Sequence, residues 1–148
     1  MESHRKTESD ARATDLSALR DACSRVLADL VAASSSVQYA SLSLVDGRSF
    51  AHANGRGSAD AARVAAVTTS LLGISGAFAK ESLAGTAKHT VIAVDTGTIA
   101  VVRVPSERRL FALSVCVGKD ENLAFVMRWT LDASVKLAQT LDTAGGNY

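Results

Sequence analysis

The sequence predicts an α+β domain whose elements follow the order α-β-β-α-β-β-β-α. Residues 14–34, 59–83 and about 122–141 carry apolar side chains at helical spacing. Five shorter segments between these helices are rich in β-branched or alternating apolar residues and are bounded by turn-forming residues, as strands are. The chain has 148 residues and is 47% hydrophobic and 21% charged, which suits one compact domain and excludes wholesale disorder.

The first helix is predicted from an apolar stripe that begins at Leu16 and ends at Val31. Residues 1–13 are polar and show no period, so we expect a disordered or loosely attached tail there. Residues 143–148 contain Gly145 and Gly146 and are expected to fray. The domain is therefore predicted to span residues 14–142.

The five strands are predicted at residues 37–45, 49–54, 90–95, 98–104 and 110–117. Asp46-Gly47 joins the first two and predicts a type I′ hairpin turn, which needs positive φ at both central residues. The last three strands are separated by short turns. Because a parallel crossover needs a dozen or more residues, we expect them to form an antiparallel meander.

The central helix is predicted at residues 59–83, with Ser58 or Asp60 as its N-cap. No charge occurs between Arg63 and Lys80, so the helix should be buried on more than one side. The run is judged too short and too rich in Thr, Ser and Gly to cross a membrane. Gly73 and Gly76 leave an alternative open, in which the helix ends near Gly73 and a loop follows.

Composition excludes several classes of function. Sixteen Lys and Arg against fifteen Asp and Glu give a net charge of +1, and aromatics make up 5%, so nucleic acid is not an implied partner. Cys23 and Cys116 lie in apolar runs and are expected to be buried free thiols in a reducing cytoplasm. No apolar run follows the polar N-terminus, so no signal peptide is expected.

Two motifs resemble reactive sites but favour plainer interpretations. Asp95-Thr96-Gly97 is similar to the aspartic-protease signature, but a hairpin turn with positive φ at Gly97 explains it better, because the predicted helices do not fit an all-β protease. Gly55-x-Gly57-x-x-Asp60 is similar to a dinucleotide loop, but its third glycine and a βαβ unit are missing. A loop followed by a helix cap is expected instead.

The remaining candidates for chemistry are scattered. His4, His52 and His89 do not have the spacing of metal ligands. A basic cluster of Arg103, Arg108 and Arg109 is predicted to be a solvated turn. Phe125 and Trp129 lie off the stripe of the last helix and either cover a rim of the sheet or form a contact surface. We therefore predict no catalytic residue, cofactor or metal ion, and no enzyme.

The order and texture of the elements resemble the roadblock/dynein light chain family over about residues 16–141. The stretch from Tyr39 to Ala53, with its apolar strand, Asp-Gly turn and short second strand, is similar to the family's opening. Leu71-Leu72-Gly73 lies where the family has its central helix. The segment 91–104 resembles the family's apolar hairpin. The segment 110–128, with Asn122-Leu123, resembles its last strand and the start of its final helix.

The resemblance implies a five-stranded antiparallel sheet with the two terminal helices on one face and the central helix on the other. It also implies a homodimer formed through two central helices and the third strands. We expect Val64, Val67, Leu71, Ile74 and Phe78 to hold the central helix on its own sheet. The predicted dimer interface is then the flank of small residues together with the third strand: Ala61, Ala65, Thr68, Leu72, Ser75, Ala79, Val91 and Ala93.

In function, the resemblance implies a dimeric scaffold or regulator that binds a small Ras-like GTPase, as bacterial stand-alone members with a GTPase-activating role do. The Ala-rich texture and the lack of accessory motifs suggest a bacterial stand-alone member, and no membrane insertion is expected. Two alternatives stay open. A profilin-like or PAS-like small-molecule sensor would need a cavity between the sheet and a helix. An enzyme would use Asp95 or a cysteine.

Overall fold

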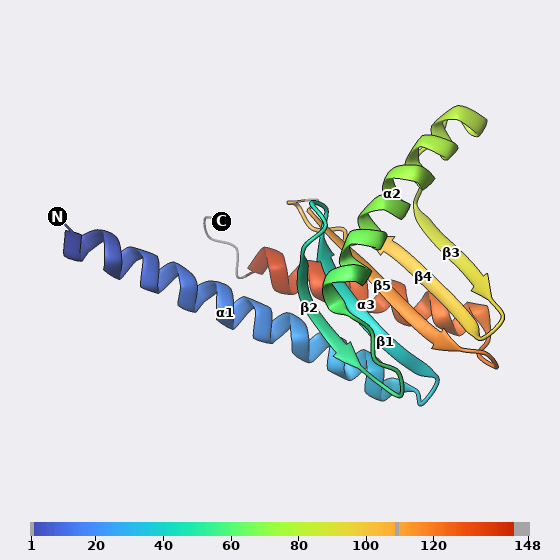
Figure 1. Ribbon diagram of the computed structural model, residues 1–148, viewed down its shortest axis with the longest axis horizontal. Helices are drawn as coiled ribbons and strands as arrows, with labels where there is room; N and C mark the ends of the chain where they lie inside the picture. Colours follow the sequence, from blue (N-terminus) through green and yellow to red (C-terminus); the bar gives the residue numbers. More distant parts are fainter. Residues whose placement is uncertain (1, 109, 144–148) are drawn as a thin grey trace.

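The computed structural model describes residues 2–108 and 110–143, which form one five-stranded sheet and three helices (Figure 1). The elements are α1 Glu2–Ala33, β1 Val37–Leu44, β2 Ser49–Asn54, α2 Ala61–Leu83, β3 His89–Val94, β4 Gly97–Arg103, β5 Phe111–Gly118 and α3 Leu123–Thr143. The predicted element order is confirmed, and most boundaries lie within two residues of the prediction.

The sheet is antiparallel throughout and has the strand order β2-β1-β5-β4-β3. Helices α1 and α3 pack on one face, and α2 crosses the other face (Figure 1). The predicted layers are therefore correct. Strands β2 and β3 form the two edges of the sheet.

The main hydrophobic core lies between the sheet and the α1–α3 pair. Helix α1 contributes Leu19, Cys23 and Leu27, and helix α3 contributes Val126 and Leu137, all buried. The strands contribute every second residue, because side chains alternate between the faces of a sheet. On this face those residues are large or apolar: Ala40, Leu42, Ala100, Val102, Leu113, Val115 and Val117.

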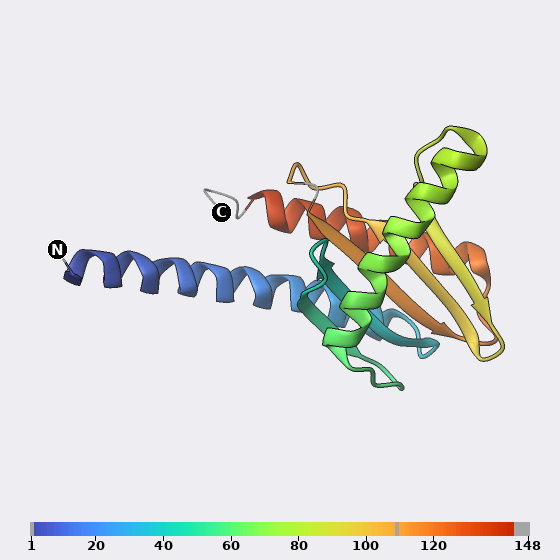
Figure 2. The ribbon, with the colours of Figure 1, turned by 45° about the horizontal axis from the view of Figure 1, so that its top comes forward.

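Helix α1 is longer than predicted. It begins at Glu2 and extends well beyond the sheet, where residues 3–18 are exposed (Figures 1 and 2). Residues 2–13, which were predicted to form a disordered or loosely attached tail, are therefore part of this helix. A buried helix supplies the nucleus at Leu19–Leu30, and adding turns to an existing helix is much easier than starting one.

At the other end of the chain, α3 includes Thr143, the first residue of the segment predicted to fray. The rest of that segment, 144–148, lies outside the described residues.

The β1–β2 hairpin differs from its prediction in the type of turn. Gly47 has φ 94°, while Asp46 keeps negative φ. The Gly47 amide donates to the Leu44 carbonyl at 3.0 Å, and the Leu44 amide donates to the Arg48 carbonyl at 2.8 Å. This pattern fits a three-residue loop that ends in a left-handed glycine rather than the predicted two-residue type I′ turn.

Helix α2 continues unbroken through Gly73 and Gly76 to Leu83, so the alternative of a loop after Gly73 is wrong. The Asp60 carboxylate accepts the Arg63 amide at 3.1 Å and caps the N-terminus, and Ala84 ends the helix in the left-handed region. With 23 residues, α2 is long and apolar enough to cross a membrane, which corrects the estimate that the run is too short.

Candidate functional site

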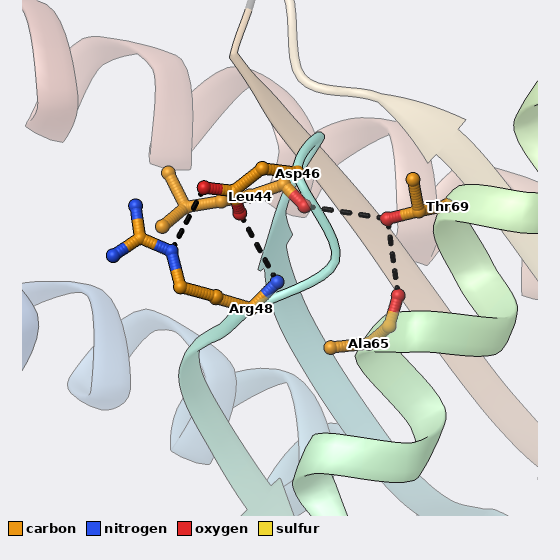
Figure 3. A network of polar contacts seen from close by, with 5 residues as sticks. All are labelled: Leu44, Asp46, Arg48, Ala65 and Thr69. Carbon is orange, nitrogen blue, oxygen red and sulfur yellow. Dashed lines mark hydrogen bonds and ion pairs between the residues drawn. The ribbon is translucent and has the colours of Figure 1, made fainter.

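Helix α2 is fixed to the sheet at the β1–β2 hairpin. The Thr69 hydroxyl lies 3.1 Å from the carbonyl of Ala65 in its own helix and 3.4 Å from the Leu44 carbonyl at the end of β1 (Figure 3). In the same turn, Arg48 pairs with Asp46 at 2.8 Å (Figure 3). The Thr69 contact with Leu44 fixes which side of α2 meets the hairpin, and the Asp46–Arg48 pair lies within the turn itself.

The side of α2 that meets the sheet is the small one. Ala65, Thr68 and Leu72 are buried, and Leu72 packs against Val101 of β4 and Ala112 of β5. The sequence-based prediction gave these three residues to a dimer interface, and their burial within the chain contradicts it. Of the other residues on that flank, Ala61, Ser75 and Ala79 are half-buried.

The large apolar residues of α2 point elsewhere. We call Val64, Val67, Leu71, Ile74 and Phe78 the outer stripe. Val67, Ile74 and Phe78 are 66%, 68% and 73% exposed, so the prediction that this stripe holds the helix on its own sheet is wrong for these three. Val64 and Leu71 are half-buried, and Leu71 packs against the cluster around Leu72. The small flank of α2 therefore packs on the sheet, and the bulky flank is only partly covered within the chain.

An apolar groove runs beside the outer stripe. Helix α2 lies mainly over β1 and β2 and reaches β4 only at Val101, so the same face of β3 and of the rest of β4 is left uncovered. We call this space, about 260 Å³, the α2 groove. Val64, Val67 and Leu71 form its wall, and its floor comes from neighbouring strands: Ile92, Ile99, Val101, Ser114 and Cys116.

Two polar groups mark the floor and mouth of the α2 groove. The Ser114 hydroxyl is buried and has no hydrogen-bond partner among the described residues. Arg63 lies at the mouth, on the exposed first turn of α2. A buried hydroxyl without a partner costs about 1–3 kcal/mol, so a partner or ligand that reached Ser114 would recover part of this energy.

The open edge of the sheet adjoins the α2 groove. Strand β3 pairs only with β4 within the described chain, and its second side has no partner strand. Ile92 faces the groove because it lies opposite Ile99 in the register. Val91 and Ala93, the predicted interface residues of this strand, point to the opposite face, beside α3. They lie on the predicted edge, and their role in an interface stays a prediction.

The cysteines and Tyr39 lack the properties of reactive groups. Burial raises the pKa of the Cys23 thiol from 9.0 to about 11 and also raises the pKa of Cys116. Burial is likewise the main cause of the raised pKa of Tyr39. All three groups are therefore protonated at neutral pH. A thiolate is needed for attack, so neither cysteine is primed as a nucleophile.

The other motifs occupy turns and loops. Asp95 and Thr96 form the exposed β3–β4 turn, as predicted. Gly97 is required for a different reason than the one predicted, because it has no positive φ. A Cβ there would lie 2.0 Å from the Val117 carbonyl oxygen. Gly55 and Gly57 precede the Asp60 cap in an irregular loop.

The remaining predicted candidates are also separated in space. Among the described residues, no three His, Cys, Asp or Glu side chains converge as metal ligands would. The Arg108 amide donates to the Ser106 hydroxyl, which in turn binds Asp142, so the β4–β5 loop is tied to α3. Arg109 lies outside the described residues. Trp129 packs between α1 and α3, and Phe125 stacks on it at 5.9 Å.

Comparison with known proteins shows the fold and leaves activity open. No family model matches the sequence, and no curated protein matches it. Among solved structures, MglB of Myxococcus xanthus is similar, with a TM-score of 0.69 and 15% identity over 89% of this chain and 93% of that one.

Two further structures resemble the chain as closely. A gliding protein, MglB of Thermus thermophilus, has a TM-score of 0.73 and 18% identity over 85% of this chain and 93% of that one. A Roadblock/LC7 domain from Streptomyces avermitilis has a TM-score of 0.70 and 17% identity over 80% and 96%. The outer stripe, the α2 groove and the β3 edge therefore lie on a roadblock-type scaffold.

Proposed function

This chain has the roadblock fold, and from that premise we propose that it is a homodimeric scaffold or regulator of a small Ras-like GTPase. The observation that carries the proposal is that the face of the sheet under α2 is incompletely covered. A bulky apolar stripe, an apolar groove and an unpaired strand edge lie side by side there. Monomeric soluble proteins rarely leave such a continuous apolar surface uncovered.

The shape of this surface suits a second copy of the chain. The outer stripe projects and the α2 groove is hollow, so two copies related by a twofold axis can each place the stripe of α2 over the groove of the other. The same axis brings two β3 edges together, which would pair their free backbone groups. Burying each large side chain of the stripe is worth about 1.5–3 kcal/mol.

The interface proposed here differs from the one the sequence predicted. The bulky residues Val67, Ile74 and Phe78 make the contact between copies, and the small residues Ala65 and Thr68 hold α2 on its own sheet. Thus α2 uses its small flank for close packing within the chain and its large flank for association.

The dimer is tested by light scattering during size exclusion at micromolar concentration. The expected mass is twice the 15.4 kDa of one chain. Val67→Asp and Ile74→Asp should give a monomer with an unchanged circular dichroism spectrum. Ala62→Asp, on the opposite exposed flank of the same helix, is the matched control and should remain dimeric. A monomer of the unaltered chain would remove the proposal.

The GTPase partner rests on the roadblock resemblance. A dimer of this kind can act without a catalytic residue of its own, by ordering the switch segments of the GTPase. The sequence shows no motif that would insert an arginine into the active site of the GTPase. We therefore assign regulation or scaffolding and no catalytic step. We place the protein in the cytoplasm, where such a partner and two free thiols belong.

The partner is tested with purified Ras-like GTPases encoded by the same genome. Each is loaded with a fluorescent GTP analogue or with GDP and titrated with the dimer, and the change in anisotropy is followed. The expected result is saturable binding that prefers the GTP form of one GTPase. Equal absence of binding for every GTPase in both states would contradict the proposal and leave the dimer standing.

A small-molecule sensor is the second candidate. The α2 groove supplies the cavity between sheet and helix that this function needs, and the unpartnered Ser114 hydroxyl supplies a polar contact within it. Native mass spectrometry of the freshly purified protein tests the idea. A bound small molecule that is lost in Ser114→Val would favour the sensor over the dimer.

A further inference from the structure

A second exposed apolar surface lies on the opposite side of the sheet, along the same edge. We call Val91 and Ala93 of β3 together with Leu131 and Val135 of α3 the β3 shelf. All four residues are exposed, and Leu131 and Val135 are 42% and 48% exposed. They lie on the other face of the sheet from the outer stripe and the α2 groove, so the proposed contact between copies does not explain their exposure.

The register places these side chains on one face. Val91 lies opposite Ala100, and Ala100 belongs to the main core under α1 and α3, so Val91 and Ala93 point to that face. Helix α3 lies over β4 and β5 and leaves β3 uncovered. Strand β3 therefore forms the floor of the β3 shelf, and the flank of α3 forms its wall.

The flank of α3 that forms this wall follows from helical spacing. Trp129, Asp132 and Lys136 face α1, because they line the cleft between the two helices. Leu131 and Val135, one turn apart, lie on the other side of α3. They therefore project over β3.

Self-association would turn two shelves into one trough. If two β3 edges pair, the strands between the two α3 helices are β4, β3, β3 and β4, and neighbouring strands lie about 4.8 Å apart. A helix seated between β4 and β5 then has its axis about 20 Å from its twofold mate. Packed helices lie about 8–10 Å apart, so the trough has room for one further helix between the two α3 helices.

We propose that this trough binds one amphipathic α-helix of a partner protein per dimer, with acidic residues beside its apolar stripe. The inference rests on the homodimer proposed above. The charges on the trough argue for acidic flanks. Arg128 of each copy is exposed on the rim of the α3 wall, so two cations flank the trough of a dimer. Asp142, the acid on that flank, is held by the Ser106 hydroxyl at 2.7 Å and the Glu107 amide at 3.3 Å.

The exposed arm of α1 from another copy does not suit the trough. Between residues 3 and 18 its one large apolar side chain is Leu16, so it has no stripe to lay on Val91 and Leu131. A docked helix needs apolar residues at i, i+3 or i+4, and i+7. The occupant is therefore a different protein.

The test uses an 18-residue fluorescent peptide with a leucine stripe at helical spacing and glutamates on both flanks. The peptide is titrated with the full-length protein, and anisotropy gives its affinity and stoichiometry. We expect one peptide per two chains. Leu131→Glu should weaken binding at least tenfold, because it places a charge against the apolar stripe. Phe125→Glu, on the other flank of α3, should leave binding within twofold.

Two control peptides and a mass measurement separate the outcomes. A scrambled peptide of the same composition should not bind, and replacing the glutamates by lysines should weaken binding at least fivefold. Equal binding by the scrambled peptide, or equal loss in Phe125→Glu and Leu131→Glu, would overturn the trough. Light scattering is run on the same samples. A dimer that ignores the peptide contradicts this inference alone, and a monomer contradicts the proposed homodimer as well.

Discussion

The two faces of the sheet are built from different side chains. On the α1–α3 face, β1 and β5 present Ala40, Leu42, Leu113 and Val115, and two helices cover them. On the α2 face, apart from the buried Tyr39 at the start of β1, the alternate residues of the same strands are small or polar: Ser41, Ser43, Ala112, Ser114 and Cys116. The first face closes a large core within one chain. The second closes only a small cluster around Leu72, Val101 and Ala112.

Helix α2 and the sheet therefore match each other in side-chain size. A face of serines and alanines lets α2 approach closely, and only its small flank can do so. The bulky flank is then directed sideways, over strands that α2 does not cover. The surface available for self-association is thus a consequence of packing inside the chain.

The largest expected effect comes from truncating the closed face. Leu137→Ala removes a fully buried side chain of the main core, and we expect a loss of about 3–4 kcal/mol in the free energy of unfolding. Urea unfolding followed by circular dichroism measures it. A loss below 1 kcal/mol would mean that the α1–α3 face is not the main source of stability.

Truncation on the thin face should cost less. Leu72→Ala leaves a smaller void, since Leu72 packs in a cluster of three buried residues, and we expect a loss of about 2 kcal/mol, near the lower end of such substitutions. The same urea titration compares the two variants at equal protein concentration. If Leu72→Ala costs more than Leu137→Ala, the ranking of the two faces is wrong.

Alkaline pH should weaken the closed face through Cys23. Its thiol has a pKa of about 11 in the fold and 9.0 as the reference value. The stabilising contribution is therefore complete below pH 9 and is lost as the pH rises toward 11. At pH 10.5 the loss due to this group is about 2 kcal/mol. Urea titrations of the unaltered chain and Cys23→Ala at pH 8 and pH 10.5 measure it, and parallel pH profiles would contradict the assignment.

The smallest expected effect lies at the start of α2. Asp60→Ala removes the carboxylate that accepts the Arg63 amide and should cost about 1 kcal/mol. Asp60→Asn keeps an acceptor at this position and should cost less than half of that. Thermal unfolding of both variants measures the difference. Equal losses would show that the side chain acts through its charge and not through the cap.

Sequence reasoning predicted the architecture well because apolar periodicity and turn residues are local signals. The order of the elements, the short turns between the last three strands and the Asp60 cap are all determined by residues that are close in the sequence. The extension of α1 to Glu2 was missed, because residues 2–13 carry no apolar stripe and helicity there spreads from the buried turns that follow.

The orientation of α2 could not be predicted from the helix alone. Both of its flanks are apolar, so periodicity shows two candidate faces and does not rank them. The signal that ranks them lies in the strands, where Ser41, Ser43 and Ser114 alternate with large residues and indicate which face accepts small partners. The steric requirement for glycine at position 97 could not be predicted either, because Val117 lies close to Gly97 only in the folded sheet.

If a second chain covers the α2 groove, Cys116 on the floor of the groove is shielded from reagents in solution. We would follow alkylation of the intact protein by iodoacetamide at pH 8, using mass spectrometry, at 1 and 100 μM protein. Cys23, fully buried in the main core, is the internal reference. The account predicts that Cys116 reacts at least tenfold more slowly at 100 μM than in the Val67→Asp variant. Equal rates of Cys116 alkylation in both proteins at every concentration would contradict it.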